Sequence, residues 1–187
     1  MTTGLPKYAD LPVVDGAPPH SSWGLWGKDD RLGSLNLLTP EKIAAASDEV
    51  RRGAIFPLNL ELTLPNPPFG GRAAVSHTVI PLLGGIGNDD QYDGLNPQSS
   101  SQLDGFAHHQ HPQYGFYNGL PREAHGIHHW ARKGIATRGV VIDLERWCAA
   151  QGQPIVHGQS RAIEAAELLA AIESQGTEIL PGDMLLI

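Results

Sequence analysis

The stretch TRGVVIDL, residues 137–144, is the most informative segment for the fold. Val140, Val141 and Ile142 form a continuous run of β-branched residues, which is typical of a short strand buried on both faces. The segment RAIEAAELLAAIESQG, residues 161–176, predicts a helix that ends at Gly176 and has four apolar residues roughly on one side, Ile163, Leu168, Leu169 and Ile172. The sequence therefore predicts a strand followed by a helix.

The last nine residues, ILPGDMLLI at 179–187, predict a turn that leads into another apolar strand. An apolar strand at the edge of a sheet pairs readily with other chains unless it is covered. We therefore expect the protein to associate as a homo-oligomer.

Upstream, LTPEKIAAASDEVRRG predicts a helix with Thr39 as N-cap and Gly53 as its stop. IFPLNLELTL, residues 55–64, alternates like a strand, and AAVSHTVIPLL, residues 73–83, is a second expected strand. The glycine-rich segment at 84–96 reads as a turn, and residues 1–36 as an irregular lead-in. Because strands and helices alternate irregularly, the pattern alone favours either an α/β or an α+β fold.

Composition limits the possible functions. A length of 187 residues with 41% hydrophobic content predicts a single domain spanning residues 1–187. The net charge of −7, with only 13 Lys and Arg, makes nucleic acid an unsuitable partner. We expect no membrane association, because no apolar run approaches the ~18 residues of a spanning helix. The single cysteine, Cys148, fits a reducing compartment, so we expect a cytoplasmic protein.

The candidate catalytic residues lie in SQLDGFAHHQH, residues 101–111. This stretch opens a histidine cluster, because six of the nine histidines fall between positions 108 and 129. Asp104 and His108 are four residues apart, so a helical turn or tight loop would bring them to one side, and both suit Zn²⁺ or Mn²⁺. Catalytic zinc usually takes three protein ligands and a water, and the candidates to complete the set are His109, His111, His125, His128 and His129.

Two interpretations of these histidines remain open. A bound metal would lower the pKa of its water to about 7, so that the water could attack an amide or ester carbonyl while an imidazole shuttles the proton. Alternatively, the histidines hydrogen-bond the loop backbone and stack on Trp130, and this second interpretation is the favoured one for each histidine outside the Asp104/His108 pair.

Five motifs occur in an order that resembles the cyclase family, which also includes kynurenine formamidases and isatin hydrolases. They are SSWGLWGKDDRLGSLNLLTPE, SSSQLDGFAHH, YNG at 117–119, TRGVVIDL and LPGDMLLI. The resemblance covers nearly the whole chain. It implies a swivelling β/β/α fold, which is an α/β fold, and a metal-dependent hydrolase that opens formamides or cyclic amides. Family members continue past the last motif, so the resemblance also implies either a truncated member or a site completed by another chain.

The family's metal motif, H-x-G-T-H-x-D-x-P-x-H, matches this chain in part. Its aspartate falls on Asp104 and its last histidine on His108. Its first two histidines fall on Gln98 and Gln102, whose amide oxygens are much weaker ligands than imidazole. The chain therefore resembles the branch with a Q-x-D-x-x-x-H window followed by Tyr-Asn-Gly.

The leading hypothesis is an arylformamidase-like hydrolase of a small-molecule formamide, cyclic amide or lactone, with zinc or manganese held by Asp104 and His108. His108 would be a ligand or a proton shuttle, and Gln102 would orient water or substrate. The substrate would be bound by Trp23, Trp26, Phe106, Tyr117 and Asn118. The alternative is a non-catalytic or truncated relative that binds a small molecule or a partner subunit. A metal-storing or metal-sensing module ranks last, because the ligands follow no compact repeat.

Overall fold

The computed structural model describes residues 4–187, which divide into two compact units. The first unit combines residues 4–53 with residues 128–187, and the second comprises residues 54–127. The first three residues of the expected lead-in lie outside the described part of the chain. The expectation that residues 1–187 act as a single domain stays a prediction.

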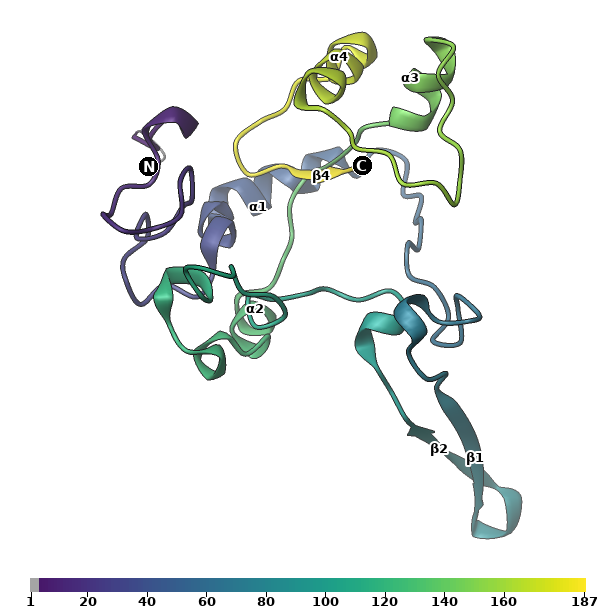
Figure 1. The fold of residues 1–187 in the computed structure, drawn as a ribbon. Helices are drawn as coiled ribbons and strands as arrows, with labels where there is room; N and C mark the ends of the chain where they lie inside the picture. The colour runs from purple at the N-terminus through teal and green to yellow at the C-terminus, as the bar shows by residue number, and fades with distance from the viewer. Residues whose placement is uncertain (1–3) are drawn as a thin grey trace. The chain divides into compact units, whose positions relative to one another are not determined.

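The core of the first unit is built on two short parallel strands, β3 (Gly139–Val141) and β4 (Met184–Leu186). Val140 pairs with Leu185 in their register. Figure 1 shows β4 as the yellow strand next to the C-terminus. Both strands were expected from the sequence. The prediction that β3 is buried on both faces is wrong, because Val141 is 62% exposed whereas Val140 is 5% exposed. Only one face of the two-stranded ribbon is covered, and Val141 points away from it.

Helix α4 (Ala165–Gln175) supplies the cover for that face. Its Ala171 is fully buried with Val140 and Ile142 of the strand segment, and Leu168 and Ile172 pack against the same cluster. The helix begins with a capping box between Glu164 and Glu167 and ends at Gly176, whose φ of 63° is the left-handed conformation that glycine adopts without strain. The expected helix is therefore confirmed, together with its stop.

The remaining helices of this unit are short: α1 (Pro40–Ala46), α2 (His128–Lys133) and α3 (Leu144–Ala150). The expected cap of α1 is present, since the Thr39 side chain accepts a hydrogen bond from the Lys42 amide. The expected stop at Gly53 is wrong, because α1 ends at Ala46. There the hydroxyl of Ser47 donates to the Ala44 carbonyl at 2.6 Å, a local bond that competes with helix continuation.

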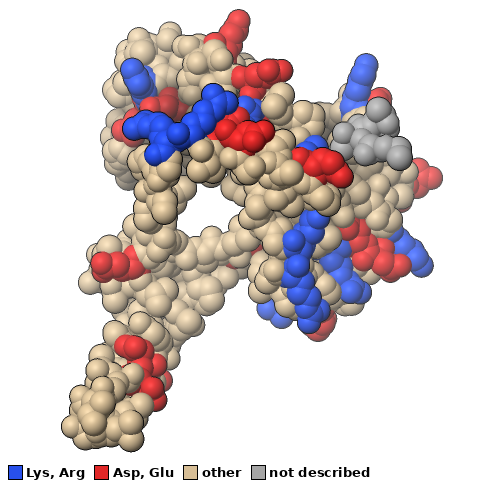
Figure 2. Space-filling model, turned by 180° about the vertical axis from the view of Figure 1, so that it is seen from behind, with Lys and Arg blue, Asp and Glu red and all other residues tan. Residues whose placement is uncertain are grey.

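The second unit contains an antiparallel hairpin of β1 (Ser76–Leu82) and β2 (Gly87–Asp93). The expected strand over 73–83 is confirmed. The expectation of a turn throughout 84–96 is wrong, because β2 pairs with β1 along its whole length and the backbone ladder overrides the turn-forming residues. Figure 2 shows acidic and no basic side chains on the hairpin; the acidic residues are Asp89, Asp90 and Asp93.

The segment at 55–64 forms no strand in the described structure and ends in a turn, where the Leu64 amide donates to the Glu61 carbonyl at 2.9 Å, so that prediction is also wrong. Its apolar side chains lie in solvent, with Ile55 88%, Phe56 74% and Leu58 75% exposed. Period-two alternation produces a strand only where a neighbouring strand supplies backbone partners. Here the backbone of Leu60 and Glu61 is bonded instead to the hydroxyls of two serines further along the chain.

The described residues thus form a mixed α/β fold, as expected. Among residues 4–187, every helix is too short or too polar to cross a lipid bilayer.

Candidate active site

The loop that carries the predicted site begins directly after the hairpin and is anchored at its first turn. The Asn96 side chain accepts a hydrogen bond from the Gln98 amide at 3.2 Å, and the buried Ser99 hydroxyl donates to the Asn96 carbonyl at 2.6 Å. This Asx-type turn fixes the direction of the chain before residue 100. The backbone of Gln98 is therefore held in place by this turn.

The next two residues attach the loop to the extended segment of the same unit. Ser101 accepts a hydrogen bond from the Leu60 amide at 2.8 Å, and the Ser100 hydroxyl donates to the Glu61 carbonyl at 3.0 Å. The hydroxyls of these serines bond the backbone of residues 60 and 61, which has no strand partner in the described structure.

Asp104 lies at the centre of the loop and is held by two side-chain amides. Gln98 donates from Nε2 to Oδ1 of Asp104 at 3.0 Å, and Gln102 donates from Nε2 to Oδ2 at 2.9 Å. Both oxygens therefore accept from neutral donors. These bonds favour the ionised carboxylate and lower the pKa of Asp104, with Gln98 as the largest cause and Gln102 as the second.

His108 faces the same carboxylate. Its Nε2 lies 3.7 Å from Oδ2 of Asp104, which is close enough for attraction between charges but too long for a hydrogen bond. The backbone amide of His108 donates to the Gly105 carbonyl at 3.1 Å, and this turn brings residue 108 back toward residue 104. The predicted pairing of Asp104 with His108 on one side of a tight loop is therefore present.

Three aromatic rings of this unit, one of them close to Asp104 in the sequence, pack together. Phe106 stacks on Tyr117 with ring centroids 4.3 Å apart, and it meets the ring of His125 edge-on at 5.9 Å. His125 is 3% exposed, and its Nε2 lies 2.9 Å from the Tyr117 carbonyl. Asn118 follows with a φ of 57°, a left-handed conformation that asparagine tolerates better than most residues. The aromatic cluster thus shapes the turn that carries the YNG motif.

The five expected substrate-binding residues fall in different units. Phe106, Tyr117 and Asn118 belong to the second unit, whereas Trp23 and Trp26 belong to the first. The structure brings Phe106 and Tyr117 into contact. That Trp23 and Trp26 line the same pocket as these residues stays a prediction.

Among the other histidines, two bond the loop backbone, as the alternative interpretation expects. His125 bonds the Tyr117 carbonyl, and Nδ1 of His111 accepts from the amides of Gln113 and Tyr114 at 3.1 and 3.3 Å. Trp130 donates from its indole nitrogen to the Arg31 carbonyl. These bonds explain part of the histidine cluster through local structure.

The donor set does not fit the expected metal. Within residues 4–187, no three His, Cys, Asp or Glu side chains are placed to hold one ion together. Asp104 and His108 would contribute two ligands, one fewer than catalytic zinc usually takes from its protein. Both oxygens of Asp104 already accept amide hydrogens, so the nearest additional groups present donors rather than acceptors.

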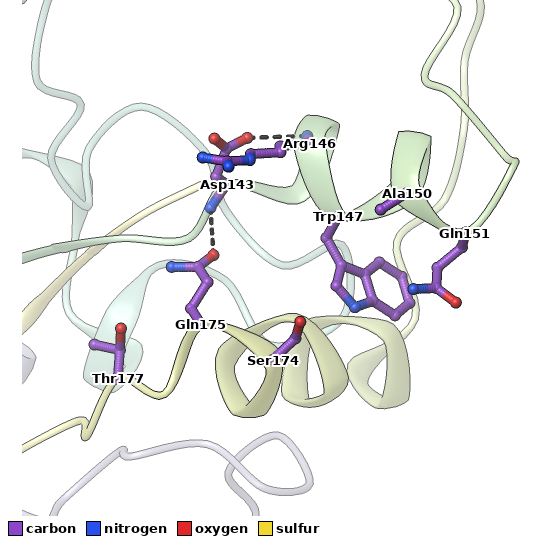
Figure 3. Close-up of a pocket in the computed structure, with 8 residues that line it drawn as sticks. All are labelled: Asp143, Arg146, Trp147, Ala150, Gln151, Ser174, Gln175 and Thr177. Carbon is purple, nitrogen blue, oxygen red and sulfur yellow. Dashed lines mark hydrogen bonds between the residues drawn. The ribbon is translucent and has the colours of Figure 1, made fainter.

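A cavity lies elsewhere, between α3 and α4 of the first unit. It has a volume of about 550 Å³, and Figure 3 shows Trp147 and Arg146 above Ser174 and Gln175. Gln175 accepts a hydrogen bond from the Asp143 amide at 2.8 Å, which ties the two helices together. None of the predicted site residues lines this cavity. No histidine is among the described residues that line this cavity, so it offers no carboxylate–histidine pair, and the Asp104 loop remains the better candidate.

Sequence reasoning identified Asp104 and His108 but missed what Gln98 does. It treated Gln98 as a position where a ligand is lost, whereas the structure shows a hydrogen-bond donor to Asp104. The spacing of six residues across an anchored turn gave no recognisable signal for this contact. Gln102, two residues from Asp104, was assigned to the site from the sequence, although as an orienting group for water or substrate.

No family model matches the chain, and no curated protein matches it. A solved structure described as that of a novel cyclase is similar, with a TM-score of 0.74 and 28% sequence identity over 88% of this chain. The matched region spans 59% of the length of that protein. The mixed α/β fold described above is therefore that of a cyclase-family structure. The combined likeness in fold and sequence supports the resemblance of the chain to the cyclase family.

Proposed function

We propose that the chain carries the reacting groups of a small-molecule hydrolase that opens formamides, cyclic amides or lactones, in the manner of an arylformamidase. The observation that carries the proposal is the pairing of His108 with a carboxylate that two amides keep ionised. A histidine beside a fixed carboxylate is a suitable general base at neutral pH. The likeness to a cyclase supports an enzymatic role for this loop.

The reaction proposed here uses the residues of the chain. The His108 imidazole takes a proton from water, and the resulting hydroxide attacks the carbonyl carbon of the substrate. Asp104 stabilises the imidazolium formed in this step, because its negative charge lies 3.7 Å away. The C–N or C–O bond then breaks, and the proton passes from His108 to the leaving nitrogen or oxygen.

Two further groups support this role. Phe106 and Tyr117 present a stacked aromatic pair close in sequence to the base, which suits an aromatic formamide or a fused cyclic amide. The nitrogen of Gln102 is engaged with Asp104, so its amide oxygen is the atom available to orient water or substrate. No step is assigned to zinc or manganese, since the donor set does not fit them.

The test is hydrolysis of an N-formyl arylamine, a cyclic amide and an aromatic lactone at neutral pH. We expect turnover of at least one of them, and a fall in kcat of about 100-fold in His108→Ala, the usual order of general-base catalysis. His157→Ala is the matched control, because His157 is an exposed histidine of the first unit that also pairs with a carboxylate. Full turnover by His108→Ala would rule out the base assigned here.

The second candidate is a non-catalytic relative that binds a small molecule or a partner subunit. It is favoured by the exposed apolar run that begins at Ile55, which suits an interface better than a solvated surface. Absence of turnover on all three substrate classes, together with saturable binding of any of them by calorimetry, would favour this candidate.

A further inference from the structure

The carboxylate of Asp104 receives its hydrogen bonds from two neutral side chains. Each oxygen accepts one hydrogen bond from a side-chain amide, Oδ1 from Gln98 and Oδ2 from Gln102. The partial positive charge of these N–H groups lies beside the carboxylate, as the charge of a cation bound to Asp104 would. His108 approaches the same carboxylate from 3.7 Å.

A metal ion bound to Asp104 would meet these two amides beside it. If Gln98 and Gln102 turned their amide groups over to offer oxygen atoms to the ion, Asp104 would lose the two hydrogen bonds that hold it. If the amides stayed as they are, those hydrogen bonds would remain, and Asp104 and His108 would supply two ligands, one fewer than catalytic zinc usually takes from its protein.

We infer that Gln98 and Gln102 take the place of a metal ion at Asp104, and that the site binds neither Zn²⁺ nor Mn²⁺ at one equivalent. The two amides are positioning groups that orient the carboxylate toward His108. This inference concerns the same loop as the proposed function but does not depend on turnover, because its test measures binding of the metal alone.

The geometry also indicates which substitutions would create a metal site at Asp104. The Nε2 atoms of both glutamines lie within 3.0 Å of Asp104, so imidazoles introduced there would converge on the same carboxylate. Together with Asp104 and His108 they would form a four-ligand set suited to zinc. The double variant Gln98→His/Gln102→His should therefore gain a metal site that the parent lacks.

The experiment is calorimetric titration of the metal-free protein with zinc chloride and with manganese chloride. We expect the parent to bind both ions weakly and the double variant to bind one equivalent of zinc at least 100-fold more tightly. The control is Gln151→His/Gln159→His, which adds two histidines at exposed positions of the first unit and should behave as the parent. Adding Asp104→Ala to the double variant should abolish the gain.

Three results would overturn the inference. The first is one equivalent of tightly bound zinc or manganese in the parent that is lost in Asp104→Ala. The second is a double variant with the parent's circular dichroism spectrum that gains no zinc affinity, because the amides would then not occupy the position of an ion. The third is an equal gain by the control variant. If the double variant does not keep the circular dichroism spectrum of the parent, the comparison of metal binding by the parent and by Asp104→Ala still tests the inference.

Discussion

Asp104 and His108 face each other across one turn of the loop, with 3.7 Å between Oδ2 and Nε2. This separation allows the carboxylate to stabilise a charged imidazole without fixing it by a hydrogen bond. The imidazole therefore remains able to turn toward a water or a substrate, while the carboxylate is held by the two glutamines.

The first prediction concerns the charge of Asp104. Asp104→Asn should lower kcat by about tenfold to 100-fold with little change in KM, because the carboxylate acts through His108 and not on the substrate. Steady-state kinetics on the best substrate measure it. Asp89→Asn, on the hairpin, is a matched control that should leave both constants unchanged. A change confined to KM would place Asp104 at the substrate instead.

The second prediction concerns the ion pair that joins β3 and β4. Arg138 donates to both oxygens of Asp183, from Nε at 3.0 Å and from a terminal nitrogen at 2.6 Å, and the Asp183 side chain is 5% exposed. Asp183→Asn should lower the free energy of unfolding by about 1.5–3 kcal/mol, the range for a hydrogen bond to a charged group. Urea titration at neutral pH measures this loss. The control is the exposed Asp89→Asn. Asp143→Asn would not serve, because Asp143 caps α3.

The same ion pair predicts a dependence of stability on pH. The hydrogen bond from Arg138 is the main cause of the lowered pKa of Asp183. A carboxyl whose pKa is lower in the folded state contributes stability above its ordinary value, and this contribution is lost as the pH falls toward the folded value. Urea titrations at pH 7 and below about pH 4 should therefore show a smaller decline in Asp183→Asn than in the parent. Equal declines would mean that Asp183 does not govern the acid sensitivity.

The sequence predicted the parts of the fold whose signals are local. Thr39, Gly176 and the apolar run at Val140 each specify a helix end or a strand through their own chemistry. The two helix ends and the strand are found, although the strand is buried on one face only. The run at 55–64 and the turn-rich segment at 84–96 were interpreted wrongly for a common reason. Whether such segments form strands depends on a partner strand, and sequence spacing does not show which segment has one.

The candidate site was predictable to a similar extent. The four-residue spacing of Asp104 and His108 was enough to expect their pairing, because a tight turn brings such residues together. The role of Gln98 was not predictable, since it depends on the turn that Asn96 and Ser99 fix through their own hydrogen bonds. The residues that hold a functional group in place are specified by loop geometry, which leaves little periodic trace in a sequence.

The next prediction concerns the aromatic pair. Phe106→Ala removes the ring that stacks on Tyr117 at 4.3 Å, a contact typically worth about 0.5–1.5 kcal/mol. If these rings bind an aromatic substrate, KM should rise by about tenfold while kcat changes little. Phe69→Ala is the control, because Phe69 is 68% exposed in the same unit. An unchanged KM for an aromatic substrate would remove Phe106 from the substrate-binding set.

The last prediction concerns association. We propose that the protein forms a homo-oligomer through the exposed apolar run at residues 55–64, where Phe56 is 74% and Leu58 is 75% exposed. Leaving such side chains in water is unfavourable, and a second copy could bury them. Phe56→Lys/Leu58→Lys should shift the protein toward the monomer in size-exclusion chromatography with light scattering. Ile86→Lys is the control, because Ile86 is 89% exposed on the hairpin turn, outside this run. A parent protein that elutes as a monodisperse monomer contradicts the prediction, whereas dissociation by both variants would extend the interface to the hairpin turn.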